Sequence, residues 1–322
     1  MIDTNLIKDD SKAFLKSLES RNYNFEIDLY RNLEASRKKF QTKTEDLQAK
    51  RNILSKEYGL LKKEGKDDES LNTKIETIKT ELDICASKLT EIQSSLKEFL
   101  LDVPNLPADS VPNGSNEEDN IKVRQFGEPS VLKGKDHLDI TSMIDTESAN
   151  LLAGSRFAVL RAEIAKLQRG LIAFMLDKAE EHGYVEHYLP MIANSESLTS
   201  TGQLPKFSDD LFKLTDDYYL IPTAEVPLTN LFRNQIIDSN VFPLKLSAHT
   251  SCFRSEAGSY GKDTKGLIRQ HQFEKVELVQ ICHPEKSFEA LENLTSHAET
   301  ILKELNLPYQ VVELCSGDLG FS

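Results

Sequence analysis

The sequence predicts an α+β protein in which a long antiparallel two-helix coiled-coil arm precedes a domain built on an antiparallel sheet. Two observations lead to this prediction. Apolar residues repeat with a seven-residue period over about residues 27–101, interrupted once by a short polar stretch. After residue 135, strand-like and helix-like runs mix without the regular alternation that is typical of a parallel, doubly wound sheet.

The predicted arm has one apolar seam on each of its two helices. In the first helix every seventh residue is apolar: Leu33, Phe40, Leu47, Leu54 and Leu61. In the second, apolar residues follow in steps of four and three: Leu71, Ile75, Ile78, Leu82, Cys85, Leu89, Ile92, Leu96 and Phe99. The break between them, KKEGKDDES (62–70), contains Gly65 and is short, so the helices should fold back on each other. Residues 4–20 predict a short amphipathic helix before the arm.

The charge of the arm differs from that of the whole chain. The chain has 39 Lys and Arg against 52 Asp and Glu, a net charge of −13, which does not favour nucleic-acid binding by the surface as a whole. The first arm helix, however, has ten basic and five acidic residues. Three interpretations stay open: a solvated helix face, a basic rod along a phosphate backbone, and a longer coiled coil formed by dimerisation.

Composition also indicates where the protein works. The N-terminus MIDTNLIKDD has no apolar core of a signal peptide, and no run reaches transmembrane length. The four cysteines form no C-x-x-C pair, which argues against a zinc site or a disulfide framework. We therefore expect a cytoplasmic protein with reduced thiols and no membrane partner.

The chain divides into three predicted parts. Residues 1–103 form an N-terminal domain that contains the arm, the proline-rich and acidic residues 104–135 form a linker, and residues 136–322 form the second domain. In the second domain, long amphipathic runs predict helices over 156–183 and 285–305. Strands are predicted over 184–190, 210–214, 218–222, 243–253, 267–281 and 309–315.

One predicted hairpin carries an unusual set of side chains, FRSEAGSYGKDTKGLIRQHQFEKVE (253–277). Because side chains alternate along a strand, Arg254 and Glu256 should share one face, and Arg269, Phe273 and Glu277 should share one face of the partner strand. Guanidinium groups suit phosphate oxygens, and a phenyl ring suits a flat heterocycle. The pattern therefore fits a nucleoside triphosphate beside an amino acid. Ordinary cross-strand salt bridges, for example Arg254 with Glu277, are the alternative.

The same residues resemble motif 2 of the class II aminoacyl-tRNA synthetases, namely FRSE, a loop, and R-x-x-x-F-x-x-x-E. Further segments narrow the resemblance to the seryl-tRNA synthetase family: GSRFAVL (154–160), TGQLPKF (201–207), LFKL (211–214), LIPTAEVPLTNL (220–231), AGSYGKDTKGLIRQHQFEKVEL (257–278) and CSGDLGF (315–321). The resemblance extends over essentially the whole chain. It implies a class II antiparallel-sheet catalytic domain over 136–322.

The resemblance implies a reaction and assigns roles to residues. The enzyme would use ATP and Mg²⁺ to convert L-serine to seryl-adenylate, and then transfer serine to tRNA(Ser), with tRNA(Sec) as a second candidate acceptor. Arg254 would be catalytic, holding the α-phosphate and the serine carboxylate. The implied ATP-binding residues are Arg254, Ser255, Glu256, Arg269 and Phe273. The implied serine-binding residues are Thr223, Ala224, Glu225, Arg254 and Glu277. Thr223 also has a purely structural interpretation, as the cap of a helix.

The resemblance also implies macromolecular partners. The basic face of the first arm helix would bind tRNA, together with two lysines of the motif 2 loop: Arg37, Lys38, Lys39, Lys50, Arg51, Lys262 and Lys265. A rigid charged rod suits structured RNA, which proteins recognise mainly by shape and phosphate contacts. The segment YVEHYLPMI (184–192) resembles motif 1, which would place Pro190 at a homodimer interface.

One element of the family pattern is missing. The third motif, G-x-G-x-x-R, does not occur in these 322 residues, and the family's magnesium ligands belong to the same region. We therefore expect a catalytic domain that is C-terminally incomplete, with no metal ligands of its own and no useful rate of serine activation alone. Two other functions stay open: a class II relative that adenylates a small amino acid for another acceptor, and a non-catalytic tRNA-binding protein.

Overall fold

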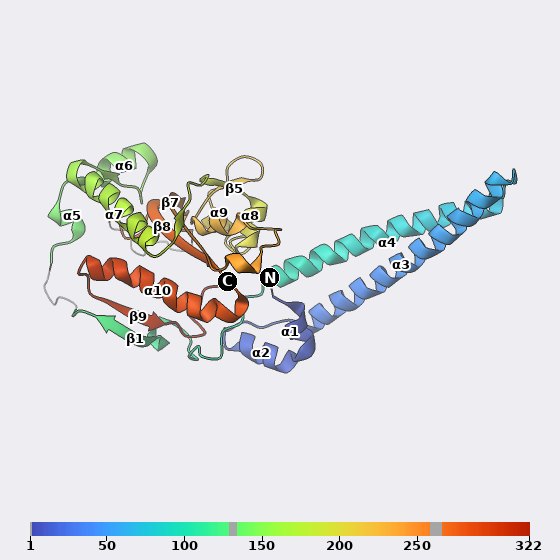
Figure 1. The fold of residues 1–322 in the computed structure, drawn as a ribbon, viewed down its shortest axis with the longest axis horizontal. Coiled ribbons are helices and arrows are strands. Elements are labelled where there is room, and N and C mark those ends of the chain that lie inside the picture. Colours follow the sequence, from blue (N-terminus) through green and yellow to red (C-terminus); the bar gives the residue numbers. More distant parts are fainter. Residues whose placement is uncertain (1, 129–133, 258–265) are drawn as a thin grey trace. The chain divides into compact units, whose positions relative to one another are not determined.

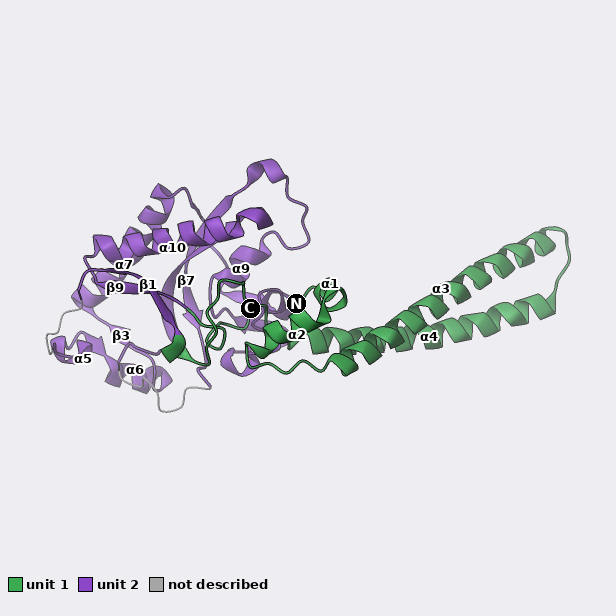
Figure 2. Ribbon diagram, turned by 90° about the horizontal axis from the view of Figure 1, so that it is seen from below, with its two compact units in different colours: residues 1–119, 314–321 green, residues 120–313, 322 purple. Residues whose placement is uncertain are grey.

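The computed structural model describes residues 2–128, 134–257 and 266–322. The chain forms two compact units, which Figure 2 colours separately. The first comprises residues 1–119 and 314–321, and the second comprises residues 120–313 and 322. Among the described residues, none of the helices combines the length and the apolar character needed to span a bilayer.

The first unit contains the predicted arm. Helices α3 (Ile27–Lys63) and α4 (Glu69–Leu101) run side by side as an antiparallel pair, which confirms the arm (Figure 1). The predicted helix over 4–20 is instead two helices, α1 (Thr4–Asp9) and α2 (Ser11–Glu19). The helix is interrupted at Asp10. The Asp10 carboxylate accepts hydrogen bonds from the Lys12 and Ala13 amides at 3.1 and 3.0 Å and so caps α2.

The arm has a thin seam and a larger core at its base. Leu47, Leu82 and Cys85 form a buried cluster along the seam. The turn between the helices passes through Gly65 at φ +75°, a conformation that favours glycine, and Asp68 caps α4 through the Leu71 amide at 3.0 Å. At the base, the buried cluster is Ile2, Ile7, Phe14, Leu18, Phe25, Tyr30, Leu96, Leu100 and Val103.

The C-terminal residues of the chain pack within the first unit. The Asn105 amide donates to the Phe321 carbonyl at 2.9 Å, and the Ser316 amide donates to the Pro112 carbonyl at 2.8 Å. The guanidinium of Arg21 donates to the carbonyls of Asn105 and Gly320, each at 2.6 Å. Residues 314–321 are therefore tied to the proline-rich segment that follows the arm.

The second unit is organised around a three-stranded sheet with the order β4–β7–β8. Strand β7 (Leu244–Phe253) pairs antiparallel with β8 (Gln272–Ile281), and the short β4 (Val185–Glu186) runs parallel to β7. Helices α7 (Ala162–Glu181) and α10 (Ser287–Glu304) cover one face, where Val276 and Leu278 of β8 lie. Helix α9 (Glu225–Asn230) packs on the opposite face, with Leu228 against Leu246 and Ala248.

Three two-stranded sheets and several short elements complete the second unit. The paired strands are β1 (Ile121–Phe126) with β9 (Tyr309–Glu313), β2 (Ile144–Asp145) with β3 (Val159–Leu160), and β5 (Ile192–Asn194) with β6 (Tyr218–Leu220). The short α-helices are α5 (His137–Ile140), α6 (Thr146–Ala153) and α8 (Ser195–Ser200). Strand β1 lies inside the segment that the sequence predicts as a linker.

Several predicted elements are shorter in the structure. The strand predicted over 267–281 begins only at Gln272, so Arg269 lies outside it. The helix predicted over 156–183 begins at Ala162, because residues 159–160 are in β3. Residues 210–214 form only a single bridge, between Lys213 and Tyr219. The apolar pattern predicts that a strand or helix is present in each segment. Its length depends on which residues find backbone hydrogen-bonding partners in the folded chain.

A buried carboxylate ties α10 to the outer strands. Glu299 is 7% exposed and accepts hydrogen bonds from Arg124 of β1 at 2.9 and 2.5 Å and from the Tyr309 hydroxyl of β9 at 2.6 Å. The hydrogen bonds from Arg124 and Tyr309 lower the pKa of Glu299 from its ordinary value of 4.5 to about 2. The ionised form of Glu299 is therefore the one that the folded protein stabilises.

We predict that Glu299→Gln lowers the free energy of unfolding at pH 7 by about 2 kcal/mol, because it removes the buried, charged acceptor of the hydrogen bonds from Arg124 and Tyr309. The native pKa lies below the unfolded one, so this stabilisation is complete above pH 4.5 and is lost as the pH falls towards 2. Urea unfolding at pH 7 and pH 3 measures it. The difference between the two proteins should shrink at the lower pH, and a constant difference would contradict the prediction.

Candidate functional site

The candidate site begins where β7 ends. Arg254 continues the antiparallel ladder by one residue, since its amide donates to the His271 carbonyl at 3.0 Å. Its Nε donates to the Pro222 carbonyl at 3.3 Å, and its guanidinium lies over the ring of Phe273, 5.2 Å from the centroid. The hairpin thus brings the predicted catalytic arginine and the predicted adenine-stacking ring into direct contact.

Glu256 and Arg269 meet just beyond the strands. The sequence predicts both on strands, which is wrong, because β7 ends at Phe253 and β8 begins at Gln272. Each residue lies three positions beyond the last pair of the ladder, and Nη1 of Arg269 is 2.6 Å from Oε2 of Glu256. Glu256 has φ +53°, a conformation that costs energy for a residue with a side chain and that is often found at functional sites.

Asp210 holds the segment that carries Glu256. The Ser255 amide donates to the Asp210 carbonyl at 2.9 Å, and the Ala257 amide donates to the Asp210 carboxylate at 3.0 Å. Sequence reasoning did not identify Asp210, because it lies more than 40 residues away in a predicted strand that does not form. Only the pairing in space shows its role.

A second group of predicted residues lies further along β8. The Thr223 hydroxyl donates to Oε2 of Glu277 at 2.6 Å, and Nζ of Lys275 lies 2.6 Å from the same oxygen. Nζ of Lys275 also donates to the Thr223 hydroxyl, at 2.9 Å. Glu277 therefore forms its ion pair with Lys275 of its own strand, and the cross-strand pair with Arg254 does not form between these described residues.

Thr223 is placed by the start of α9. Its side chain is buried, with the residue 4% exposed, and its hydroxyl accepts a hydrogen bond from the Glu225 amide at 3.2 Å. Ala224 occupies the cap position of α9 and is fully buried in the core beneath. The N-cap residue is therefore Ala224 and not Thr223, although the Thr223 hydroxyl bonds the Glu225 amide at the helix start and also reaches the sheet.

The charges of this second group influence one another. Surrounding protein atoms raise the pKa of Glu225, although part of its side chain stays exposed, and the nearby negative charge of Glu277 raises it further. The positive charge of Lys275 acts in the opposite direction. Burial raises the pKa of Cys252, which keeps this thiol neutral. Two carboxylates and one ammonium thus share one region of the sheet face.

Small residues of β7 make room for this region. Three small residues of β7 are fully buried, and each pairs with a long residue of β8: Ala248 with Glu277, Thr250 with Lys275, and Cys252 with Phe273. On this face, the short side chains of β7 therefore leave space beside the long side chains of β8. A cavity of about 330 Å³ reaches Phe273 and is lined on its other sides by Phe157, Leu267, Gln270, Gln272 and Glu274. Of the predicted site residues that the structure describes, only Phe273 lines this cavity.

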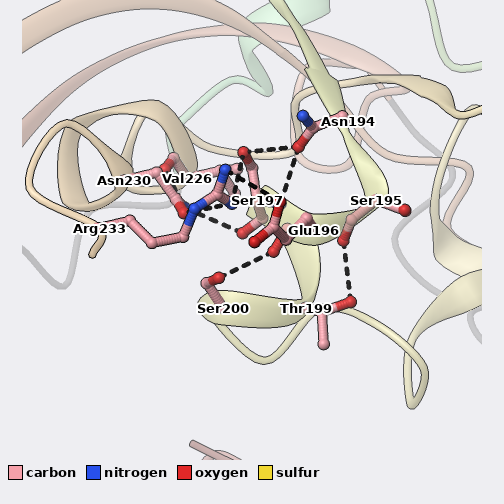
Figure 3. Close-up of polar contacts among 9 residues, drawn as sticks. All are labelled: Asn194, Ser195, Glu196, Ser197, Thr199, Ser200, Val226, Asn230 and Arg233. Atoms are coloured by element: carbon pink, nitrogen blue, oxygen red, sulfur yellow. Dashed lines mark hydrogen bonds and ion pairs between the residues drawn. The ribbon is translucent and has the colours of Figure 1, made fainter. Parts of the chain in front are cut away.

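A polar network braces α9 against α8 (Figure 3). Nδ2 of Asn230 donates to the carbonyls of Ser197 and Val226, at 3.0 and 2.8 Å. The guanidinium of Arg233 donates to the Asn230 side chain at 3.0 Å and pairs with Glu196 at 3.4 Å. The sequence analysis did not identify these residues, because each belongs to a short polar stretch whose partner lies in another helix.

The residues predicted to bind tRNA differ in how far their side chains are exposed, and two of them lie outside the described residues. On α3, Lys38, Lys39 and Lys50 are exposed and Arg51 is half-buried. Arg37 instead forms a bidentate pair with Glu34, with hydrogen bonds of 2.7 and 2.9 Å from Nε and Nη2. These two nitrogens are therefore already used within the protein. Lys262 and Lys265 lie outside the described residues. Pro190, predicted at a dimer interface, is exposed.

Comparisons with known proteins agree with this architecture. Residues 1–107 match the family model of the seryl-tRNA synthetase N-terminal domain, and residues 206–322 match that of the tRNA synthetase class II core domain (G, H, P, S and T). A serine–tRNA ligase of Francisella philomiragia is 51% identical over 332 aligned positions, covering 100% of this chain and 78% of the relative.

Two solved structures are similar over the full chain. Seryl-tRNA synthetase from Pyrococcus horikoshii, complexed with ATP, superposes with a TM-score of 0.87 at 31% identity, covering 100% of this chain and 78% of that one. The cytoplasmic serine–tRNA ligase from Naegleria fowleri, in complex with AMP, has a TM-score of 0.82 at 25% identity, covering 100% and 77%.

The antiparallel pair of β7 and β8, with its arginine-bearing hairpin and the matching core domain, defines a class II aminoacyl-tRNA synthetase. The helical arm and the relatives make the assignment narrower. The chain belongs to the seryl-tRNA synthetase family, whose members are ATP-using ligases, as the sequence predicted.

Proposed function

We propose that the sheet face around Arg254 and Glu277 activates L-serine with ATP, and that the arm binds the tRNA that accepts the serine. One observation carries this proposal: Phe273, Lys275 and Glu277 alternate along β8 and therefore face the same side, with Arg254 over the ring and Thr223 against the carboxylate. This region suits an aminoacyl-adenylate. Arg254 and the ring of Phe273 lie at one end, for the nucleotide, and the carboxylates of Glu277 and Glu225 lie at the other, for the amino acid.

The chemistry asks mainly for positioning and charge. A serine carboxylate oxygen forms a bond to the α-phosphorus while the bond to pyrophosphate breaks, and negative charge builds on the phosphoryl oxygens. Arg254 is permanently charged and is held by Pro222 and Phe273, so it can bind both reacting groups and stabilise that charge. No proton has to pass through the protein in this step.

The adenine would be held at the Phe273 end. Arg254 lies over the ring of Phe273, and the base would stack on this aromatic group. Glu256, oriented by Arg269, can accept a hydrogen bond from the exocyclic amine, and Ser255 lies beside it. Arg269 would also contact the triphosphate. The serine ammonium would lie at the other end, near Glu277, Glu225 and the backbone of Ala224.

Magnesium would enter the site bound to the phosphates of the nucleotide, as part of the substrate. The described residues contain no group of three or more His, Cys, Asp or Glu side chains arranged to bind a metal ion.

We further propose that residues 1–103 bind tRNA(Ser) and residues 136–322 carry the chemistry. The exposed Lys38, Lys39 and Lys50 on α3 support contacts with phosphates along the arm. Arg37, Arg51, Lys262 and Lys265 would add to them, and tRNA(Sec) is the second acceptor that we propose. The four free cysteines fit a reducing compartment, so we propose the cytoplasm as the location.

We also propose a homodimer that forms through the segment around Pro190. Tyr188 is 97% exposed there, and Val185 and Ile192 are also exposed, so residues 185–192 present several apolar side chains at the surface. Contiguous exposed apolar residues of this kind favour a protein interface.

Replacing Arg254 with alanine should abolish amino-acid activation and leave tRNA binding intact. We expect a loss of about 100-fold in affinity for seryl-sulfamoyl-adenosine, a stable mimic of the adenylate, because two or more charge-assisted hydrogen bonds disappear. Calorimetry measures this binding, and serine-dependent ATP–pyrophosphate exchange in a chain extended by the family's third motif measures the reaction. Unchanged affinity for the mimic, or lost tRNA affinity, would count against the assignment.

Neutralising Lys38, Lys39 and Lys50 together should weaken tRNA binding without changing affinity for the adenylate mimic. Each lost phosphate contact should make the slope of log affinity against log salt shallower by about one. Filter binding of tRNA(Ser) at several salt concentrations gives this slope. The triple variant Lys74, Lys79 and Lys97 to Gln, on α4, is a control with the same change in net charge, and an equal effect of the two triples would refute a specific basic face.

Tyr188→Lys should convert the dimer to a monomer, because it places a charge in the proposed apolar interface. Sedimentation equilibrium at micromolar concentration should show about half the mass of the unsubstituted chain. Phe288→Lys, at an exposed position of α10, should leave the mass unchanged. A monomeric unsubstituted chain, or a dimeric Tyr188→Lys variant, would rule out this interface.

A further inference from the structure

We propose that Lys275 is a positioning residue for the amino-acid end of the site: it orients Glu277 and Thr223 and leaves a single net negative charge there for the substrate ammonium. This inference rests on the proposed function. It assigns a role to a residue that the motif pattern leaves unassigned, at the position between Phe273 and Glu277 on β8.

The first support is the geometry around Oε2 of Glu277. This oxygen forms an ion pair with Nζ of Lys275 at 2.6 Å and accepts a hydrogen bond from the Thr223 hydroxyl at 2.6 Å. The other oxygen, Oε1, has no hydrogen-bond partner among the described residues. The ion pair and the hydrogen bond on one oxygen fix the orientation of the carboxylate, and the second oxygen keeps its lone pairs for an amine from outside the chain.

The second support is the state of the Thr223 hydroxyl. Its proton goes to Glu277, and its lone pairs accept from Lys275 at 2.9 Å and from the Glu225 amide at 3.2 Å. A hydroxyl has one proton and two lone pairs, so its capacity is used in full. Thr223 therefore links β8 to the start of α9 and sets the distance between Glu277 and Glu225, and Lys275 completes this link.

The third support is the balance of charge. The groups that face this region are Glu277 and Lys275 from β8, Glu225 from α9, the neutral Cys252 from β7, and Arg254 at the far end. The negative charge of Glu277 favours the protonated form of Glu225, and the positive charge of Lys275 opposes this effect. Lys275 beside Glu277 therefore favours two ionised carboxylates, which leaves one net negative charge to match one ammonium.

A purely structural lysine would behave differently on substitution. The Lys275 side chain is 30% exposed, so a methionine of similar length would keep most of its packing and the strand pairing. Lys275→Met removes the charge, the ion pair with Glu277 and the hydrogen bond to Thr223, and Lys275→Arg keeps the charge. The matched control is Lys286→Met, which removes an exposed lysine paired with Glu289 at 2.9 Å outside the site.

Calorimetry with two probes tests the proposal. Seryl-sulfamoyl-adenosine carries the ammonium, and sulfamoyl-adenosine lacks the whole seryl group. At pH 6.5 we expect Lys275→Met to bind the seryl probe at least 10-fold more weakly and the shorter probe unchanged. Measured in two buffers of different ionisation enthalpy, the seryl probe should release more protons from Lys275→Met than from the unsubstituted chain or Lys275→Arg.

Each alternative outcome has a definite meaning. If Lys275→Met loses affinity for both probes equally, or releases no extra proton, Lys275 is a structural residue and the proposal is overturned. Unchanged binding of the seryl probe overturns it as well. If the unsubstituted chain does not distinguish the two probes, the proposed function itself fails, and the role of Lys275 fails with it. Urea unfolding of each variant shows whether the fold is retained.

Discussion

The register between β7 and β8 is the constraint on which the candidate site depends. Because Cys252 is opposite Phe273 and Ala248 is opposite Glu277, small buried residues on one strand lie beside long functional ones on the other. The same register, continued past the strand ends, brings Glu256 to Arg269. A shift of one residue would turn Phe273, Lys275 and Glu277 towards α7 and α10, and would destroy the site and the helix packing together.

The sheet face has two halves that different elements complete. At the Arg254 end, loop contacts from Asp210 and Pro222 hold the chain in conformations that strands do not provide, including the positive φ of Glu256. At the Glu277 end, Thr223 joins the sheet to α9, and α9 is itself braced by Asn230 and Arg233. The rigid hairpin thus supplies the directions of the side chains, and neighbouring loops supply their exact placement in a polar network.

Prediction from the sequence succeeded where a local pattern is sufficient. The heptad positions Leu47, Leu82 and Cys85 form the buried seam of the arm, because apolar spacing alone determines which side of a helix can be buried. It failed at boundaries, such as the late start of β8 at Gln272, and for residues such as Lys275 and Asp210. Their contacts depend on partners far away in the chain, and a charged residue on a strand has the same appearance whether it faces solvent or a ligand.

By itself, the sequence determined the α+β class, the helical arm and the family, because these follow from apolar periodicity and from motifs that are continuous in the chain. Only the tertiary structure decided that Glu277 pairs with Lys275, that Arg37 is held by Glu34, and that Arg254 covers one face of Phe273. The physical reason is that charged and aromatic side chains reach several partners of similar strength, and the choice among them depends on distances that only the folded chain sets.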